Sequence, residues 1–237
     1  MSKLVALDDG HGPETAGKRT PDGVHENQFN SPTVGFCATA IQRSGLQVIF
    51  TAPEDTDIPL ATRVKRANDA EADVFISIHY NAFRSKWDET QGGIETHYYP
   101  GSIEGWKLAT IIQKYVRLGT PQIDRGIKAS SFVVLRDTHM PSALIENGFM
   151  DVHKEADLML NKDYQKEQGE QMAQGICEYL GVAYVPETEG EIMPEDVKQL
   201  LRTMNKTAYM LIDEMPVKEQ LNYLKVCVDR YFTNGGQ

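Results

Sequence analysis

Residues 74–81 read Val-Phe-Ile-Ser-Ile-His-Tyr-Asn, and this stretch decides the fold class. β-Branched and aromatic residues dominate its first five positions, a composition typical of a strand buried on both faces. Two shorter apolar runs, at 4–7 and 46–50, have the same character. Segments with helical periodicity separate the three runs, and strands that alternate with helices favour a parallel sheet. The sequence therefore predicts an α/β fold.

The alternation continues to about residue 183. We expect helices at about 25–44, 59–70, 102–117 and 152–180, and further strands at 94–99, 131–135 and 143–145. Gly45 and Gly181 follow two of these helices, as glycine commonly does at a helix C-terminus. The expected architecture of residues 1–183 is a single, mostly parallel twisted sheet with helices on both faces.

The sequence predicts a second, smaller unit after residue 183. Segment 184–192 is acidic and contains Pro186 and Gly190, which is typical of a linker. Residues 193–237 contain two helical patterns, and a piece of about 45 residues buries little apolar surface by itself. We expect a small helical domain that binds a target or associates with a second copy of itself. A helical extension without a partner of its own is the alternative.

Composition excludes several classes of protein. The net charge of −10 disfavours nucleic-acid binding, which needs a basic surface to neutralise phosphates. The three cysteines form no CxxC pair, so a cysteine zinc site is not expected. No stretch approaches the roughly 20 apolar residues of a membrane span. The apolar run at 4–7 is too short for a secretory signal peptide, so synthesis in the cytoplasm is expected.

Histidines and carboxylates follow the expected strands. His11 comes shortly after the first strand, His79 and Glu146 lie at the ends of two others, and Glu26 opens a helix. The carboxyl ends of parallel strands meet at one edge of the sheet. Two imidazoles and one carboxylate form a catalytic zinc set, which activates water, and a further carboxylate such as Glu146 can take the proton. His25, beside Glu26, is a rival ligand.

Five blocks of the sequence occur together, in the same order, in one enzyme family. They are LDDGHG at 7–12, ENQFN at 26–30, RVKRAN at 63–68, ADVFISIHYNA at 72–82 and MPSALIENGF at 140–149. On these blocks the chain resembles the zinc-dependent N-acetylmuramoyl-L-alanine amidases of the amidase-3 type over residues 1–182. Asp9 and Asn147 depart from the common family residues, but neither departure removes a ligand.

The resemblance implies a site and a reaction. It assigns one zinc ion to His11, Glu26 and His79, and thus selects Glu26 over His25. It assigns catalysis to Glu146, while Arg63 and Asn81 are candidates for contacts to substrate or to the ligands. The implied reaction is hydrolysis of the amide between the lactyl group of N-acetylmuramic acid and L-alanine in bacterial peptidoglycan.

The resemblance fits a phage endolysin or a sporulation lysin. Either enzyme would act on the cell wall after release from the cytoplasm. The helices of residues 193–237 are then expected to bind the wall or to self-associate. Two alternatives remain open. One is a zinc peptidase that cuts within the stem peptide, and the other is an inactive protein that binds the cell wall.

Overall fold

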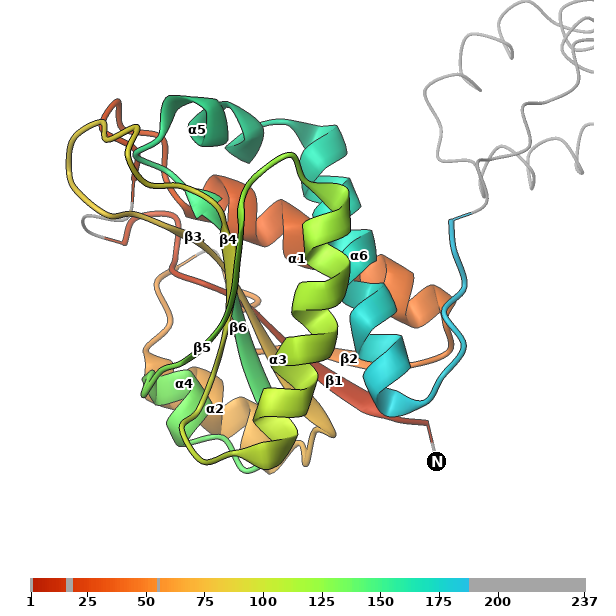
Figure 1. Cartoon of the computed structure of the whole chain (residues 1–237). Coiled ribbons are helices and arrows are strands. Elements are labelled where there is room, and N and C mark those ends of the chain that lie inside the picture. Colours follow the sequence, from red (N-terminus) through yellow and green to blue (C-terminus); the bar gives the residue numbers. More distant parts are fainter. Residues whose placement is uncertain (1, 16–18, 55, 188–237) are drawn as a thin grey trace, which may run out of the picture. The chain divides into compact units, whose positions relative to one another are not determined.

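A computed structural model describes residues 2–15, 19–54 and 56–187 of the chain (Figure 1). The strands are β1 (Leu4–Asp9), β2 (Gln47–Phe50), β3 (Val74–Asn81), β4 (Ile94–Tyr98), β5 (Asp124–Ala129) and β6 (Ser142–Phe149). The helices are α1 (Asn27–Arg43), α2 (Leu60–Asp69), α3 (Ile103–Val116), α4 (Val133–Arg136), α5 (His153–Met159) and α6 (Lys162–Leu180), and a 3-10 turn, η1, spans Arg117–Gly119. The predicted helical domain at 193–237 lies outside the described residues.

The six strands form one sheet in the order β2-β1-β3-β6-β4-β5. All neighbouring pairs are parallel except β4 and β6, which are antiparallel. The α/β class and the mostly parallel sheet are thus confirmed, with one antiparallel pair that the sequence did not predict. Because β3 is central, its run of residues 74–78 is wholly buried.

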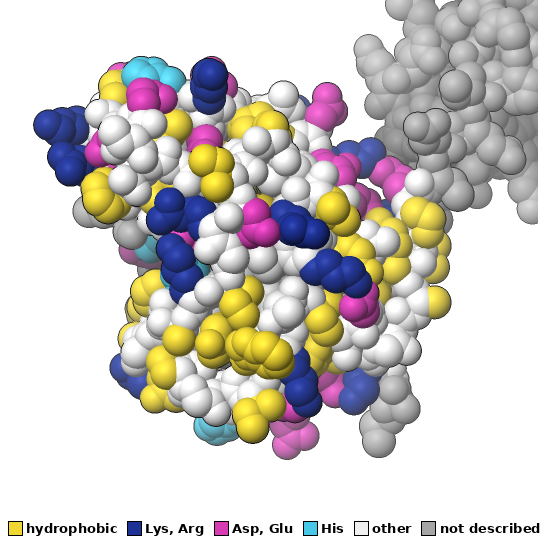
Figure 2. Space-filling view, viewed as in Figure 1, with side chains coloured by type: hydrophobic (Ala, Val, Ile, Leu, Met, Phe, Trp, Pro, Cys, Tyr) yellow, Lys and Arg dark blue, Asp and Glu magenta, His cyan; other side chains and the backbone are white. Residues whose placement is uncertain are grey.

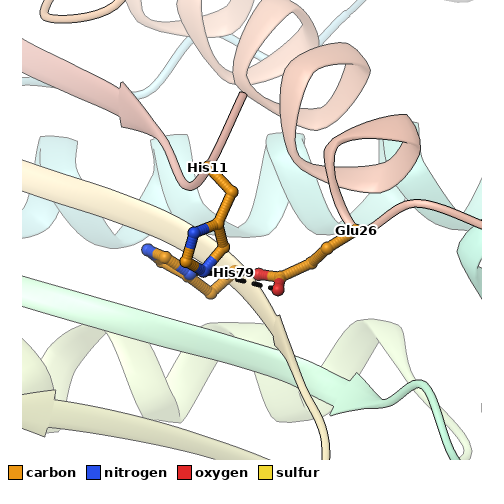
Figure 3. Close-up of side chains that lie close together, drawn as sticks. All are labelled: His11, Glu26 and His79. Carbon is orange, nitrogen blue, oxygen red and sulfur yellow. Dashed lines mark hydrogen bonds and ion pairs between the residues drawn. The ribbon is translucent and has the colours of Figure 1, made fainter. Parts of the chain in front are cut away.

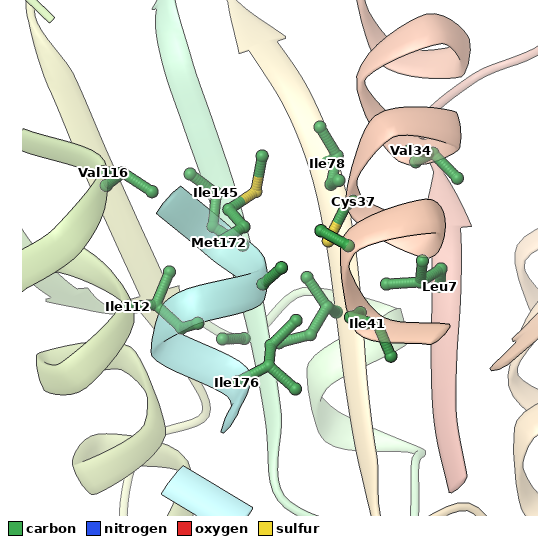
Figure 4. Packing of buried hydrophobic residues seen from close by; sticks show 14 of the residues in the cluster. Leu7, Val34, Cys37, Ile41, Ile78, Ile112, Val116, Ile145, Met172 and Ile176 are labelled. Atoms are coloured by element: carbon green, nitrogen blue, oxygen red, sulfur yellow. The ribbon is translucent and has the colours of Figure 1, made fainter. Parts of the chain in front are cut away.

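Helices cover the two faces unequally. On one face α1, α3 and α6 pack over the main core, whose side chains include Leu7, Ile78 and Ile145 from the sheet (Figure 4). On the other face α2 and α4 cover a smaller cluster that includes Ala6, Phe75 and Leu144. The strand residues of this smaller cluster lie near the start of the parallel strands. The polar residues of the same face lie nearer the carboxyl ends of these strands.

Two predicted elements need correction. The strand predicted at 131–135 is wrong, because residues 133–136 form helix α4 and the strand is β5 at 124–129. Gly126 and charged residues interrupt the apolar alternation of this edge strand, whereas Val133, Val134 and Leu135 resemble a strand only in composition. The helix predicted at 152–180 is divided into α5 and α6, since the side chain of Asn161 caps α6 by accepting a hydrogen bond from the Tyr164 amide.

Among the described residues, no helix is both long enough and apolar enough to cross a membrane.

Candidate metal centre

Three side chains from separate parts of the sequence meet at the carboxyl edge of the sheet (Figure 3). His11 follows β1, Glu26 precedes α1 and His79 lies in β3, and one ligand atom from each lies within 4.8 Å of the other two. The His79 Nδ1 atom is 3.0 Å from Glu26 Oε1, and the His11 Nε2 atom is 3.5 Å from Glu26 Oε2. The three predicted ligands therefore converge as expected.

The loop after β1 brings His11 to this position. His11 has a φ of 60°, a left-handed conformation that is uncommon for a residue with a side chain. Its carbonyl accepts a hydrogen bond from Asn27 Nδ2, and the Gly10 carbonyl accepts one from Asn30 Nδ2. Gly10 lies against the His79 ring, because a Cβ atom at Gly10 would stand 2.2 Å from His79 Cε1. The DGHG segment thus fixes both imidazoles at once.

The buried carboxylate of Glu26 is held in its charged form. Burial alone raises the pKa of Glu26, but the hydrogen bond and the charge of His79 outweigh burial and lower it below its ordinary value. Burial likewise lowers the pKa of His79, and the contacts with Glu26 more than reverse this, so the pKa of His79 is raised. Asn30 Nδ2 donates a further hydrogen bond of 3.1 Å to Glu26 Oε1.

A series of buried, hydrogen-bonded polar side chains leads to the Nε2 atom of His79. The Nε2 atom of His79 is 3.0 Å from the Ser77 hydroxyl, which donates a 2.6 Å hydrogen bond to Asp8. The Asp8 carboxylate also accepts hydrogen bonds from Thr51 and Arg63, at 2.6 and 2.9 Å. Ser77, Asp8 and Arg63 are all 1% exposed or less. Both ring nitrogens of His79 therefore have a partner, Glu26 at Nδ1 and Ser77 at Nε2.

Glu146 lies beside the ligand cluster but is not a member of it. It pairs in register with His79 of β3 and with Glu95 of β4. Paired residues on adjacent strands carry their side chains on the same face, and neighbouring strands lie about 4.8 Å apart. Glu146 lies within β6 rather than after its end, since that strand continues to Phe149.

The candidate substrate residues have different surroundings. Asn81 is partly exposed, and its Nδ2 atom donates to Glu95 Oε1 at 3.2 Å. Arg63 is 1% exposed, and its guanidinium donates to Asp8 and to the backbone carbonyls of Ile58 and Asp9. This placement favours a role for Arg63 in holding the loop after β1 over a contact with substrate. The rival ligand His25 lies outside the cluster of three.

Several residues of this region were not predicted from the sequence. Asp8 and Ser77 are buried polar residues within strands, which is a signal because such groups need partners. Glu95, Arg125 and Lys128 form a charged cluster next to Glu146. Arg125 and Lys128 were missed because the strand that carries them was predicted at the wrong residues.

The donor set fits a zinc ion. Zinc bonds of about 2.0–2.2 Å in a tetrahedron place ligand atoms roughly 3.3–3.6 Å apart. The distances of 3.0 and 3.5 Å from Glu26 to the two imidazoles are close to this spacing. The two histidines reach different oxygens of Glu26, so the carboxylate lies between them. Two imidazoles and one carboxylate, partly open to solvent, are the ligands of a catalytic zinc site.

Known proteins are similar to this chain in sequence. The family model Amidase_3, described as N-acetylmuramoyl-L-alanine amidase, matches residues 5–178. The endolysin of Bacillus phage SPP1 is 33% identical over 186 residues, which cover 77% of this chain and 68% of the endolysin. The uncharacterized Bacillus subtilis protein YqiI is 31% identical over 180 residues, which cover 75% of this chain and 84% of YqiI.

Solved structures agree with this. The crystal structure of an N-acetylmuramoyl-L-alanine amidase from Clostridium difficile 630 superposes with a TM-score of 0.71 at 33% identity, covering 76% of this chain and 97% of that one. The chain therefore belongs to the N-acetylmuramoyl-L-alanine amidase family, Amidase_3. The resemblance inferred from the five sequence blocks is confirmed.

Proposed function

We propose that this protein is a zinc-dependent N-acetylmuramoyl-L-alanine amidase. Its reaction hydrolyses the amide between the lactyl group of N-acetylmuramic acid and the L-alanine of the stem peptide in peptidoglycan. The observation that carries the proposal is the convergence of His11, Glu26 and His79, with Glu146 on the neighbouring strand, in a chain that belongs to the amidase family.

In this proposal His11, Glu26 and His79 hold one zinc ion. When bound, zinc supplies Lewis acidity, which polarises the scissile carbonyl and acidifies a water molecule. Glu146 accepts a proton from the attacking water and passes it to the alanine nitrogen as the carbon–nitrogen bond breaks. The products are a muramic acid with a free lactyl carboxylate and a peptide with a free amino end.

The chain's own residues prepare the site for this chemistry. Gly10 lets the loop after β1 lie against the His79 ring, and Asn27 and Asn30 anchor that loop and Glu26 to the start of α1. Asn81 stays a candidate for a contact with substrate, which its partial exposure and its position two residues beyond His79 on the same strand support.

Mass spectrometry of digested peptidoglycan tests the proposal. The protein is stripped of metal with a chelator, and the digestion is run before and after zinc is restored. We expect stem peptides that begin with free L-alanine, together with intact muramic acid, only after zinc is added. Peptides cut at an internal bond would instead identify a stem-peptide peptidase, and no cleavage under either condition would identify a wall-binding protein.

We also propose that the protein acts on the cell wall after release from the cell that makes it. The likeness to a phage endolysin supports this place of action. The wall-binding or self-associating role of residues 193–237 stays a prediction. Retention of the full chain, compared with a chain ending at residue 187, on purified cell walls measures the first role.

A further inference from the structure

A charged cluster lies next to the proposed catalytic carboxylate. Glu95 of β4 stands in register with Glu146, and His97 follows it on the same face. On the outer side of β4, His97 pairs in register with Lys128 of β5. The row of polar side chains that begins at His79 thus continues past Glu146 to the sheet edge formed by β5.

Glu95 is the centre of this cluster. Its side chain is 5% exposed and accepts hydrogen bonds from Arg125 Nε at 2.7 Å and from Lys128. His97 Nε2 lies 3.1 Å from the same carboxylate. Burial alone raises the pKa of Glu95, but the hydrogen bonds from His97, Lys128 and Arg125 lower it to about 2. Glu95 therefore remains negatively charged and holds both cationic side chains in place.

Glu95 does not accept from every hydrogen-bond donor of Arg125 and Lys128. The side chains of Arg125 and Lys128 are 29% and 37% exposed, so both cations keep donors open to solvent beside the carboxylates of Glu95 and Glu146. Arg125 also donates to the Gly92 carbonyl and lies over the Phe149 ring, which fixes its position. An ammonium group has three donors, and a single carboxylate contact leaves Lys128 able to bind another anion. Figure 2 shows Lys and Arg side chains over the face that carries α3, whereas the Glu95 cluster lies on the other face of the sheet.

The side of the metal centre toward β1 and β2 is lined by different residues. There His11 borders a cavity of about 370 Å³ between the loops after β1 and β2 and the start of α1. Phe50, Ala52 and Pro53 line it together with the acidic residues Asp9 and Glu54. Glu54 is ion-paired with Arg66, and the apolar lining offers no partner to a carboxylate, so this side suits the neutral sugar.

We infer that Lys128, positioned with Arg125 by Glu95, forms a subsite for a carboxylate on the peptide portion of the substrate. The inference rests on the proposed function, which makes a peptide attached to a sugar the substrate. The peptide then crosses β6, β4 and β5 from the scissile bond, and the sugar lies on the side of β1 and β2. Lys128 acts as a specificity residue that favours peptides with a free carboxylate over amidated ones.

Two synthetic substrates test this subsite. Both are muramoyl-L-alanyl-D-glutamate with the γ-carboxylate blocked as an amide, and the α-carboxylate is free in one and converted to an amide in the other. We expect the wild-type protein with zinc to cleave the carboxylate form with a kcat/KM about five- to tenfold higher, mainly through KM, because a hydrogen bond to a charged group is lost in the amide. Lys128→Gln should reduce this preference to below about twofold, and Lys128→Arg should keep it.

Lys114→Gln is the matched control. It removes the same charge from an exposed lysine on α3, which is paired with Glu178 on the opposite side of the sheet. The preference should be unchanged in this variant. Equal kcat/KM for the two substrates in the wild type, or an undiminished preference in Lys128→Gln, overturns the inference.

A binding measurement separates the subsite from the reaction. Two dipeptides, L-alanyl-D-glutamate blocked as the γ-amide and the same compound also blocked as the α-amide, are titrated into the zinc-loaded full chain by calorimetry. Tighter binding of the free carboxylate in the wild type, lost in Lys128→Gln, supports the subsite even if muramoyl amides are not cleaved. Equal binding of both dipeptides contradicts it whether or not the amidase activity is found.

Discussion

The Ser77 hydroxyl lies 3.0 Å from His79 Nε2 and donates its own proton to Asp8 at 2.6 Å. In a zinc-bound site an acceptor at Nε2 selects the tautomer that carries its proton there, which leaves the Nδ1 lone pair for the metal. Asp8 is in turn fixed by Arg63 and Thr51. Groups that hold the second nitrogen of a ligating histidine orient the ring and raise metal affinity. The buried polar groups Ser77, Asp8 and Arg63 thus orient His79 for its proposed role as a zinc ligand.

Ser77→Ala removes this contact and should weaken zinc binding. The loss of such a partner commonly reduces metal affinity about 10- to 100-fold. Competition with a chromophoric chelator measures the affinity of the metal-free protein for zinc without any assay of activity. Ser130→Ala is the matched control, because Ser130 bonds His97, which lies outside the ligand cluster. Equal affinity in Ser77→Ala and wild type would contradict the role of Ser77.

Gly10→Ala should disrupt the same histidine from the other side. A Cβ atom at Gly10 would lie 2.2 Å from His79 Cε1 and 2.4 Å from both ring nitrogens, so the ring has to move. We expect zinc affinity to fall at least about tenfold, because ligand geometry sets the affinity. Gly35→Ala is the control, since nothing lies within 4 Å of its added methyl group in α1. That variant should be more stable by about 0.5–1 kcal/mol and bind zinc as wild type does.

Glu146→Gln tests the proposed proton transfer. The amide keeps the size of the side chain but cannot accept a proton, and general-base catalysis contributes about 10²–10⁴-fold. We expect kcat for a muramoyl-L-alanine substrate to fall by this factor while zinc affinity is retained, because Glu146 is outside the ligand cluster. Glu104→Gln, on the exposed surface of α3, should leave kcat unchanged. Activity within a factor of ten of wild type in Glu146→Gln would remove Glu146 from the mechanism.

The sequence predicted the central parts of the fold well. The runs at 4–7 and 74–78 have strong β-branched or apolar character because β1 and β3 lie inside the sheet with helices on both faces. The same burial makes polar residues at their ends conspicuous, and His11 and His79 were identified on this basis. The choice of Glu26 over His25 needed the family blocks, because adjacent residues at a helix start have no distinguishing periodicity.

The edge of the sheet was less predictable. Strand β5 is half-buried and contains Asp124, Arg125 and Lys128 with Gly126 at a φ of 70°, so no apolar alternation marks it. The antiparallel pairing of β4 with β6 depends on contacts between segments about 50 residues apart, which local patterns do not encode. Burial of Arg63 was likewise hidden, because its partner Asp8 lies 55 residues away.

Arg63→Gln distinguishes a supporting role from a contact with substrate. Arg63 and Asp8 are both 1% exposed, and loss of one member leaves the other charge buried and unpaired. Such a change typically costs about 3–5 kcal/mol of unfolding free energy. Denaturant unfolding measures it, with Arg136→Gln, an exposed arginine paired to Asp137, as a control that should change stability by less than about 1 kcal/mol. A stable Arg63→Gln variant with a raised KM would instead show that Arg63 contacts substrate.

Glu95→Gln should change how stability depends on pH. The pKa of Glu95 is lowered from 4.5 to about 2 in the folded protein. A carboxylate with a lowered pKa stabilises the fold above its unfolded pKa, and the contribution is lost as the pH falls through the folded pKa. This shift corresponds to on the order of 3 kcal/mol at neutral pH. The difference in unfolding free energy between wild type and Glu95→Gln should therefore be largest at pH 7 and shrink between about pH 5 and pH 2. Urea unfolding of both proteins at pH 7, 5 and 3.5 measures it. A difference that stays constant over this range would show that Glu95 stabilises the fold by packing rather than by its charge.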